Sequence, residues 1–331
     1  MKSNEPLLSV LVMAYKRKEF IMEAIKSVLN QSIGINNYEI VCVIGFHDDE
    51  LSLFFQKNNI KELFCDGKMG QTITLGLQAC NSDVIVFIED DDRFRNDKLE
   101  RVLQAFSNYN CNYYHNNVEL IDQKSRPILS VLDPYDVQLT RSFIWDTTRG
   151  YRYILRHRGD FNMSSIAIRK SSLKPHMEVL SKIETSPDSI IFFLLMEANM
   201  CFMFDDEKTT FYRVHNSETN FIGSIDPSKA LDTSLRFYRS RLIAYQAMHS
   251  PSVRRIFIAY VLESKLGTYI AGQKDLKPHL SEEFRFFLIA LTRPSKFYMR
   301  LLSATILTSI FPDYVKRVME RRRLEKYKQM Q

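Results

Sequence analysis

The chain has 331 residues, of which 45% are hydrophobic and 25% are charged, with only 10 Gly and 10 Pro. This balance fits a globular chain able to bury a sizeable core, and it excludes a linker-rich or disordered protein. The formal net charge is a modest +6, from 45 basic and 39 acidic residues, so the placement of charge matters more than its sum.

Short apolar runs alternate with helical patterns over about the first 110 residues. Leu8–Ala14 is a continuous apolar run rich in β-branched residues, as expected of a strand covered on both faces. Further strand-like runs are Tyr38–Ile44, Ile60–Cys65 and Val84–Ile88. Apolar residues at helical spacing lie around them, at Ile21, Ile25, Val28 and Leu29, at Ile73, Leu77 and Cys80, and at Leu99, Val102, Leu103 and Phe106. The alternation predicts an α/β fold, a mostly parallel sheet flanked by helices that binds ligands beyond the carboxyl ends of its strands.

The middle of the chain is less regular. Ser164–Ile168 and Thr209–Val214 are predicted strands. Ser186-Pro187-Asp188 is a strong helix start, because a capping hydroxyl is followed by proline and then by an acid in the first turn. The following run Ile190–Met196 is apolar all round, which predicts a buried helix.

From about Asp226 the chain is predicted to contain helices without strands. The expected helices are Ser228–Met248, Ser252–Gly272, Ser281–Leu291, Phe297–Phe311 and Asp313–Gln331. We therefore predict an α/β domain over residues 1–225 and an all-helical C-terminal region over residues 226–331.

Four adjacent acids, Glu89-Asp90-Asp91-Asp92, directly follow the run Val84–Ile88. Their mutual repulsion raises their pKa values unless a cation or hydrogen bonds compensate. Oxygen ligands favour Mg²⁺ or Mn²⁺, and Mg²⁺ typically binds one or two carboxylates together with substrate phosphates. The ordinary alternative is a solvated acidic loop that caps the helix beginning near Asp97.

Several short motifs occur in an order and spacing that resembles the family 2 glycosyltransferases, which have the GT-A fold. They are Ser9–Tyr15, Ala24–Gln31, Lys68-Met69-Gly70 with Leu75-Gly76-Leu77, the acidic Phe87–Asp92, and Asp97–Glu100. The match covers roughly the first third of the chain, with weaker traces to Asn220. The resemblance implies an inverting, nucleotide-sugar-dependent transferase, with a nucleotide-binding half at about 1–110 and an acceptor half at about 111–225.

The resemblance also implies roles for individual residues. Asp92 would hold the metal ion that bridges the donor diphosphate, and Asp90 and Asp91 would contact the ribose or the metal. A divalent cation there neutralises the charge that develops on the leaving diphosphate. Further expected donor contacts are Ala14, Tyr15, Lys68 and Gly70.

Three later residues complete the predicted site. Asp188 matches the family's general base, which deprotonates the acceptor hydroxyl, and Glu184 is the reserve candidate. Arg213 is expected to pair with phosphate and His215 to be a metal ligand. The ordinary alternatives are an acid that stabilises a helix N-terminus and a structural histidine at a strand end.

The sequence departs from the family pattern at the end of its second strand. The family has an aspartate pair there that contacts the base and ribose, whereas this chain has Ile44 and Gly45, with Asp48 and Asp49 further on. The donor nucleotide, UDP- or GDP-linked, therefore stays open.

The C-terminal region is predicted to associate with a membrane surface. Val315–Lys328 carries seven basic residues against two acidic ones, and aromatic and aliphatic residues fill the preceding Phe297–Phe311. Such basic amphipathic helices fit the interface of an anionic bilayer, although a helical bundle or a homo-oligomer interface is the alternative. Nucleic acid is not expected, because no base-reading motif accompanies the charge.

The expected location is the cytoplasmic face of a membrane, as a peripheral protein. The N-terminus does not resemble a signal peptide, and no stretch reaches the ~18 apolar residues of a membrane span. The five scattered cysteines lack metal-ligand spacing and suit a reducing cytosol.

The sequence thus predicts metal-dependent glycosyl transfer to a membrane-associated acceptor, either lipid-linked or a polysaccharide. One alternative is a nucleotidyltransferase, but the segment after the first strand, Ala14–Lys18, lacks the glycines of its phosphate loop. The other is a non-catalytic nucleotide-sugar-binding scaffold, which the missing aspartate pair favours.

Overall fold

The structure is a computed structural model. It describes residues 6–15, 17–128, 142–145, 154, 157–197, 201–214, 227–277, 296–315, 317–318 and 321. The chain divides into two compact units. The first comprises Met1–Ile183 and Pro187–His215, and the second comprises Glu184–Ser186 and Asn216–Gln331.

The first half of the first unit alternates strands and helices, as predicted. Its elements in order are β1 (Leu8–Ala14), α1 (Ile21–Leu29), the 3₁₀ helix η1 (Ile35–Asn37), β2 (Tyr38–Ile44), α2 (Asp49–Lys57), β3 (Lys61–Phe64), α3 (Met69–Ala79) and β4 (Val84–Glu89). β1 pairs in parallel with β2 and β4, and β2 pairs in parallel with β3. The carboxyl ends of these four strands therefore meet at one edge of the sheet.

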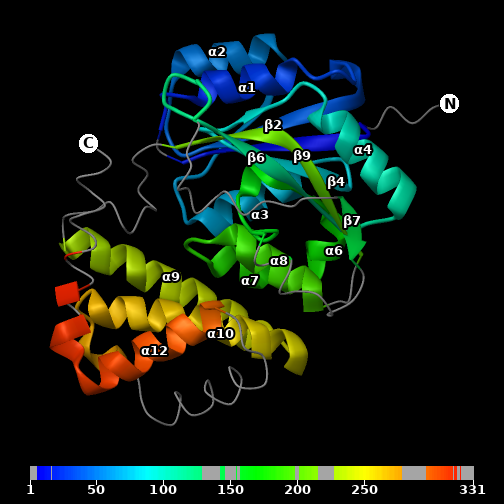
Figure 1. The fold of residues 1–331 in the computed structure, drawn as a ribbon. Coiled ribbons are helices and arrows are strands. Elements are labelled where there is room, and N and C mark those ends of the chain that lie inside the picture. The colour runs from blue at the N-terminus through cyan, green and yellow to red at the C-terminus, as the bar shows by residue number, and fades with distance from the viewer. Residues whose placement is uncertain are drawn as a thin grey trace. The chain divides into compact units, whose positions relative to one another are not determined.

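Helices cover both faces of this part of the sheet (Figure 1). Every residue of β1 is buried, and because side chains alternate between faces, such a strand needs a layer on each side. Val10 and Val12 join the core cluster that contains α1 residues such as Ile25. Leu11 points to the other face, where its side chain meets Gly76 of α3.

The second half of the sheet is mixed. It contains β5 (Arg93–Phe94), α4 (Lys98–Tyr109), β6 (Tyr113–Ile121), β7 (Phe143–Trp145), the 3₁₀ helix η2 (Met163–Ser165), β8 (Ile166–Arg169) and β9 (Phe202–Arg213). The strand order is β3-β2-β1-β4-β8-β6-β9-β5, with β7 paired to β9. β8 runs antiparallel to both β4 and β6, whereas β6 and β9 are parallel. The α/β fold class is confirmed, and the antiparallel pairs are an addition that the alternation in the first half did not predict.

Three short helices and one buried helix complete the first unit. They are α6 (Lys170–Leu173), the 3₁₀ helix η3 (Lys174–His176), α7 (Met177–Lys182) and α8 (Pro187–Glu197). In α8 every residue from Ser189 to Met196 is buried, which confirms the helix predicted from its start signal and its apolar run.

The second unit is helical over its described residues. It contains α9 (Pro227–Ala247), α10 (Pro251–Ile270), the 3₁₀ helix η4 (Lys274–Leu276) and α12 (Lys296–Ile310). Leu301 and Leu302 of α12 pack against Ala259 and Leu266 of α10. The expected helix over 281–291 and most of the one over 313–331 lie outside the described residues. Within the described part, every helix is too short or too polar to cross a bilayer.

Gly70 marks a close approach between α3 and the end of α7. A Cβ atom there would lie 1.8 Å from the carbonyl oxygen of Leu180, and the Gly70 N–H donates to the carbonyl of Ile183 at 3.1 Å. We expect Gly70→Ala to lower the free energy of unfolding by about 1–3 kcal/mol. Gly267→Ala is the matched control, since nothing lies within 4 Å of its added Cβ and alanine favours a helix interior by about 1 kcal/mol. Thermal unfolding of both variants tests this, and an unchanged melting temperature for Gly70→Ala would contradict the close approach.

Candidate functional site

Three of the four acids Glu89–Asp92, at the end of β4, converge at the carboxyl edge of the sheet. Glu89, Asp91 and Asp92 each offer a carboxylate oxygen within 4.8 Å of the others. Glu89 is held in place because β4 pairs with β1 at Met13, and its N–H donates to the hydroxyl of buried Ser164 at 3.0 Å. Glu89 was not among the predicted metal ligands, although its place in the four-acid run is the signal that would have found it.

Asp92 is the most deeply buried member of this acidic cluster, with no exposed surface. Its Oδ1 accepts the backbone N–H of Arg213 at 2.9 Å. Its Oδ2 is buried and has no hydrogen-bond partner among the described residues. A buried carboxylate oxygen without a partner is costly for the charged form, so this atom suits a cation ligand.

The acidic cluster raises the pKa values of its own members. Burial, and then the charge of Asp91, raise the pKa of Asp92 to about 8, while polar groups of Ser164, Arg213 and Asn162 act in the opposite direction. Burial and the charges of the neighbouring acids raise the pKa of Glu89 well above its ordinary value. Without a cation the two carboxylates therefore resist ionisation together.

Arg17 reaches the other two predicted acids from the loop after β1. Its Nη2 lies 2.8 Å from Oδ1 of Asp90 and 2.7 Å from Oδ2 of Asp91. Asp90 is nearly buried, and its N–H donates to the Met13 carbonyl at 3.1 Å. The structure thus brings Asp90, Asp91 and Asp92 to one edge, and it adds a cationic side chain that the sequence analysis had not singled out.

Asp188 lies near this cluster at the start of α8. Its Oδ2 accepts the backbone N–H of Asn162 at 3.0 Å, and its charge is among the causes that raise the pKa of Glu89. Asn162 has a positive φ of 70°, which Asn tolerates better than most residues. The reserve candidate Glu184 instead belongs to the second unit, where its N–H donates to Ser240 at 2.9 Å.

The predicted phosphate contact of Arg213 is not supported by its geometry. The Arg213 side chain has no exposed surface, and each of its five guanidinium N–H groups has a protein acceptor. The acceptors are the carbonyls of Asp91, Asp122 and Gln123, the carboxylate of Glu23 and the hydroxyl of Ser125. Arg213 therefore positions the acidic cluster through its backbone N–H and Nε, and its guanidinium is already fully hydrogen-bonded.

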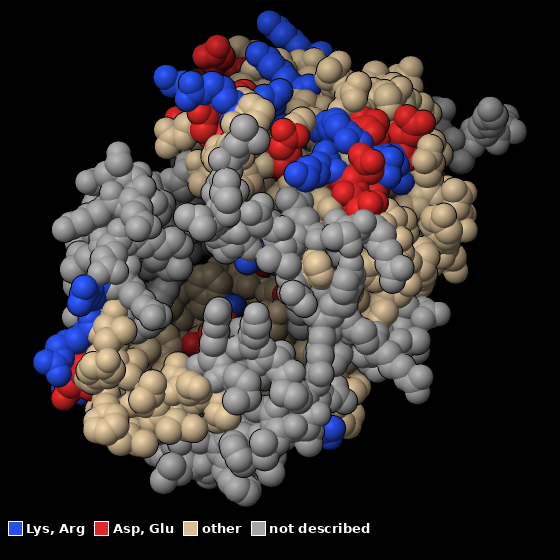
Figure 2. All heavy atoms as spheres, in the orientation of Figure 1, with Lys and Arg blue, Asp and Glu red and all other residues tan. Residues whose placement is uncertain are grey.

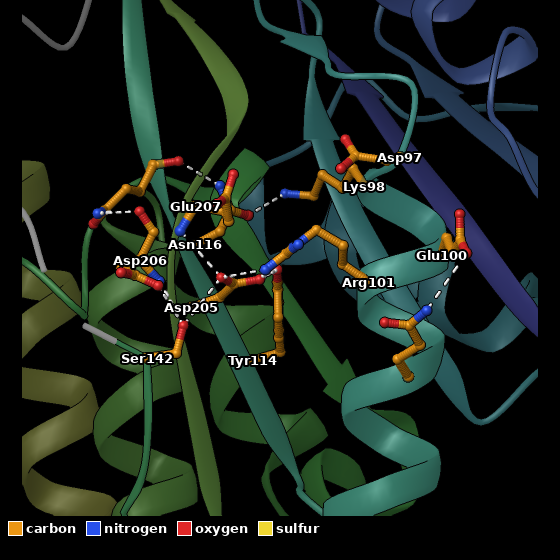
Figure 3. Close-up of polar contacts among 12 residues, drawn as sticks. Asp97, Lys98, Glu100, Arg101, Tyr114, Asn116, Ser142, Asp205, Asp206 and Glu207 are labelled. Carbon is orange, nitrogen blue, oxygen red and sulfur yellow. Dashed lines mark hydrogen bonds and ion pairs between the residues drawn. The ribbon is translucent and has the colours of Figure 1, made fainter. Parts of the chain in front are cut away.

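A second buried cation, Lys98, supports the cluster from the start of α4. Its Nζ donates to Asn116 at 2.6 Å, to the Ser164 carbonyl at 2.7 Å and to Thr210 at 2.8 Å. Figure 3 shows Lys98 pointing toward Asn116, beside the ion pair of Arg101 with Asp205. Burial lowers the pKa of Lys98 well below its ordinary value. Since Ser164 also accepts the N–H of Glu89, Lys98 helps to fix the end of β4.

The remaining predicted donor contacts lie at the same edge of the sheet or at the start of a helix. Ala14 is the buried last residue of β1, and Tyr15 follows it. Lys68 is exposed at the N-cap of α3, and Gly70 is buried against α7. The binding roles of these four residues stay predictions. His215 lies outside the described residues.

Comparison with known proteins places this site in a family. The model of glycosyl transferase family 2 matches residues 9–176, just over half of the chain. An uncharacterised glycosyltransferase of Haemophilus influenzae is 22% identical over 221 residues, which is 64% of this chain and 80% of the relative. One of Rickettsia conorii is 32% identical over 133 residues, but the matched segment is only 22% of that longer protein and 39% of this chain.

Solved structures show the same fold at low identity. Residues 1–349 of TarS from S. aureus, in complex with UDP-GlcNAc, give a TM-score of 0.58 at 12% identity and cover 98% of this chain and 90% of that one. The mannosyltransferase PcManGT from Pyrobaculum calidifontis, in complex with GDP-Man and Mn²⁺, gives 0.55 at 11% identity, covering 98% and 88%. Because the family match includes the acidic strand end and the fold agrees over almost the whole length, this chain belongs to glycosyltransferase family 2.

Proposed function

We propose that this chain is an inverting, metal-dependent glycosyltransferase that moves a sugar from a UDP- or GDP-linked donor to a membrane-associated glycan or lipid-linked acceptor. The observation that carries the proposal is the buried Oδ2 of Asp92, which has no hydrogen-bond partner in the described part of the chain and lies within a cluster of three carboxylates. TarS with UDP-GlcNAc and PcManGT with GDP-Man and Mn²⁺ support a nucleotide-sugar donor and a divalent ion.

The residues present fit a hard divalent cation. Glu89, Asp91 and Asp92 supply only oxygen ligands, the set that Mg²⁺ and Mn²⁺ prefer. A bound cation would neutralise charge on the donor diphosphate as the sugar–phosphate bond breaks. It would also allow Glu89 and Asp92 to ionise, because opposite charge favours the carboxylate form.

Asp188 is the general base in this proposal. An inverting transfer needs a carboxylate to take the proton of the acceptor hydroxyl as that oxygen attacks the anomeric carbon. The hydrogen bond from Asn162 fixes the direction of the Asp188 carboxylate. The charge of Asp188 is one of the causes that raise the pKa of the neighbouring Glu89, and the acidic cluster to which Glu89 belongs marks where the donor diphosphate would lie.

Helix α12 supplies the proposed membrane contact, at a cytoplasmic surface. Its buried residues Leu301, Leu302, Thr305 and Thr308 leave the opposite face exposed. That face and the following residues carry large exposed apolar side chains, namely Ile306, Leu307, Ile310, Phe311 and Tyr314. In Figure 2 the surface at the place of α12 is mostly uncharged, with charged side chains beside it. Exposed Arg317 and Arg321 follow, and each basic residue near an anionic surface contributes about 1 kcal/mol.

A donor screen tests the catalytic claim. Incubation with UDP- and GDP-sugars and a lipid extract as acceptor should release a nucleoside diphosphate in the presence of Mn²⁺ or Mg²⁺. Asp188→Asn should lower turnover by about 100-fold or more while metal-dependent binding of the nucleoside diphosphate is retained, since Asn still accepts the N–H of Asn162. Release of inorganic pyrophosphate instead would indicate a nucleotidyltransferase, and unchanged turnover would remove Asp188 from the mechanism.

The raised pKa of Asp92 predicts how stability depends on pH. Asp92 keeps its proton to about pH 8 when folded but ionises near its ordinary value of 3.8 when unfolded. Between these values the folded state binds more protons, so this group's contribution to stability falls as pH rises. Metal-free Asp92→Asn should therefore gain melting temperature over the wild type between about pH 5 and pH 8, in the direction that linkage requires.

Addition of Mn²⁺ should reverse this difference, because the cation binds the ionised carboxylate. The wild type should gain more stability from Mn²⁺ at the higher pH, and Asp92→Asn should gain little. Equal stabilisation of both proteins would show that Mn²⁺ binds elsewhere.

Membrane association is tested on the exposed face of α12. The double substitution Ile310→Ser with Phe311→Ser should weaken co-sedimentation with anionic vesicles by about tenfold or more, because each buried apolar side chain is worth about 1.5–3 kcal/mol. Leu53→Ser on α2, where the side chain is 57% exposed, is the matched control and should sediment like the wild type. Undiminished binding of the double variant would contradict the proposed contact.

A further inference from the structure

The end of β2 leaves no room for an acid at the edge of the site. Ile44 is only 1% exposed, with its side chain in the core. A Cβ atom on Gly45 would lie 2.2 Å from the carbonyl oxygen of Tyr15 and 3.2 Å from that of Cys65. Both obstacles are backbone atoms, so an aspartate at position 45 would require the ends of β1 and β3 to move apart. A donor base at this edge must therefore be recognised by other side chains.

An aromatic pair, rather than an acid, lies at this edge of the sheet. The rings of His47, just after β2, and Phe64, the last residue of β3, stack with centroids 4.3 Å apart and planes 11° from parallel. Both residues are exposed, and 46% of Phe64 is open to solvent. β3 is the edge strand of the sheet, so among the described residues no further strand covers this pair. Exposed flat rings are the surfaces on which nucleobases stack, because every base has a π-face.

The loop after β1 connects this aromatic pair to the acidic cluster. Arg17 pairs with Asp90 and Asp91. The next residue, Lys18, donates to the carbonyl of His47 at 3.3 Å and pairs with Asp48 at 3.0 Å. Arg17 and Lys18 are consecutive, so their Cα atoms are about 3.8 Å apart. Arg17 contacts the carboxylates of Asp90 and Asp91, and Lys18 contacts the backbone of His47 in the aromatic pair. A nucleoside diphosphate has the same layout, with a flat base at one end and a charged diphosphate at the other.

The backbone next to His47 is held in place by contacts of its neighbouring residues. His47 follows Phe46, which is partly buried and packs against the main core cluster. The ammonium group of Lys18 lies 5.1 Å from the centre of the Phe46 ring. Asp48 caps α2 by accepting the N–H of Leu51 at 3.0 Å. The backbone that carries His47 is therefore held on both sides, so the pair is a preformed surface.

We propose that His47 and Phe64 form the stacking platform for the donor nucleobase, in place of a carboxylate that reads the base. This inference rests on the proposed nucleotide-sugar function and assigns the part of the site that binds the base of the nucleoside. The base stacks on the exposed ring surface, while the diphosphate lies toward Arg17 and the acidic cluster. Recognition by stacking accepts any base with a π-face, so the platform gives affinity for both UDP and GDP.

The test compares ligands with and without a base. Affinities of UDP, GDP and inorganic pyrophosphate are measured by calorimetry with Mn²⁺ for the wild type, His47→Ala, Phe64→Ala and Phe64→Leu. We expect each alanine variant to bind UDP and GDP about tenfold or more weakly, with pyrophosphate affinity unchanged. Phe64→Leu, which keeps apolar volume but loses the π-face, should behave like Phe64→Ala.

Tyr109→Ala is the matched control. Tyr109 is an aromatic residue with 50% exposure at the last position of α4. It lies about 16 Å along the helix from the first residue of α4, which is the helix end nearer in sequence to the acidic cluster. It should bind all three ligands like the wild type.

The outcomes separate the two proposals. Unchanged affinity of the His47 and Phe64 variants for UDP and GDP overturns the stacking platform and leaves the metal site intact. An equal loss for pyrophosphate also overturns it, because the effect would then not concern the base. If the wild type binds neither pyrophosphate nor nucleotide in a Mn²⁺-dependent way, the proposed function itself fails.

Discussion

The structure depends on one electrostatic constraint, the burial of the Asp92 carboxylate at the carboxyl end of β4. One of its oxygens is satisfied by the N–H of Arg213 and the other has no partner among the described residues. An ionised carboxylate in such a place is stable only if a cation compensates for the lost hydration. The neighbouring Glu89 and Asp91 increase this requirement, and each offers a carboxylate oxygen within 4.8 Å of those of the other two acids.

Two buried cations among the described residues of the first unit, Arg213 and Lys98, support this arrangement indirectly. Arg213 reaches Glu23 of α1 and the turn after β6, while Lys98 joins α4 to β6, β9 and the residue that holds Glu89. Neither group has exposed surface. They fix the distances between elements around the acidic cluster, whereas Arg17, which pairs with Asp90 and Asp91, is partly exposed at this edge of the sheet. This division explains why an arginine next to a predicted metal site need not bind phosphate.

Sequence patterns predicted best where local and tertiary requirements agree. The predicted bounds agree within a few residues with those of β1, β4, α9, α10 and α12. The start of α8 was also predicted, from its capping residue and proline. The long strand β6 was not predicted from the sequence. Its polar residues His115, Asn116 and Asn117 are buried through tertiary hydrogen bonds, which no local sequence pattern shows. The buried hydrogen bonds of Arg213 could not be predicted for the same reason: its acceptors come from segments up to 190 residues away. The closed end of β2 was visible in sequence only as a missing acid, and its cause, the Tyr15 carbonyl beside Gly45, required coordinates.

A crystal structure with Mn²⁺ and UDP, using the anomalous signal of manganese, tests the central claim most directly. We expect one ion bound to Oδ2 of Asp92 and to Glu89 or Asp91, with the diphosphate on its open side. An ion bound away from these carboxylates, or a nucleotide seated at this edge with Asp92 still protonated and unligated, would contradict it.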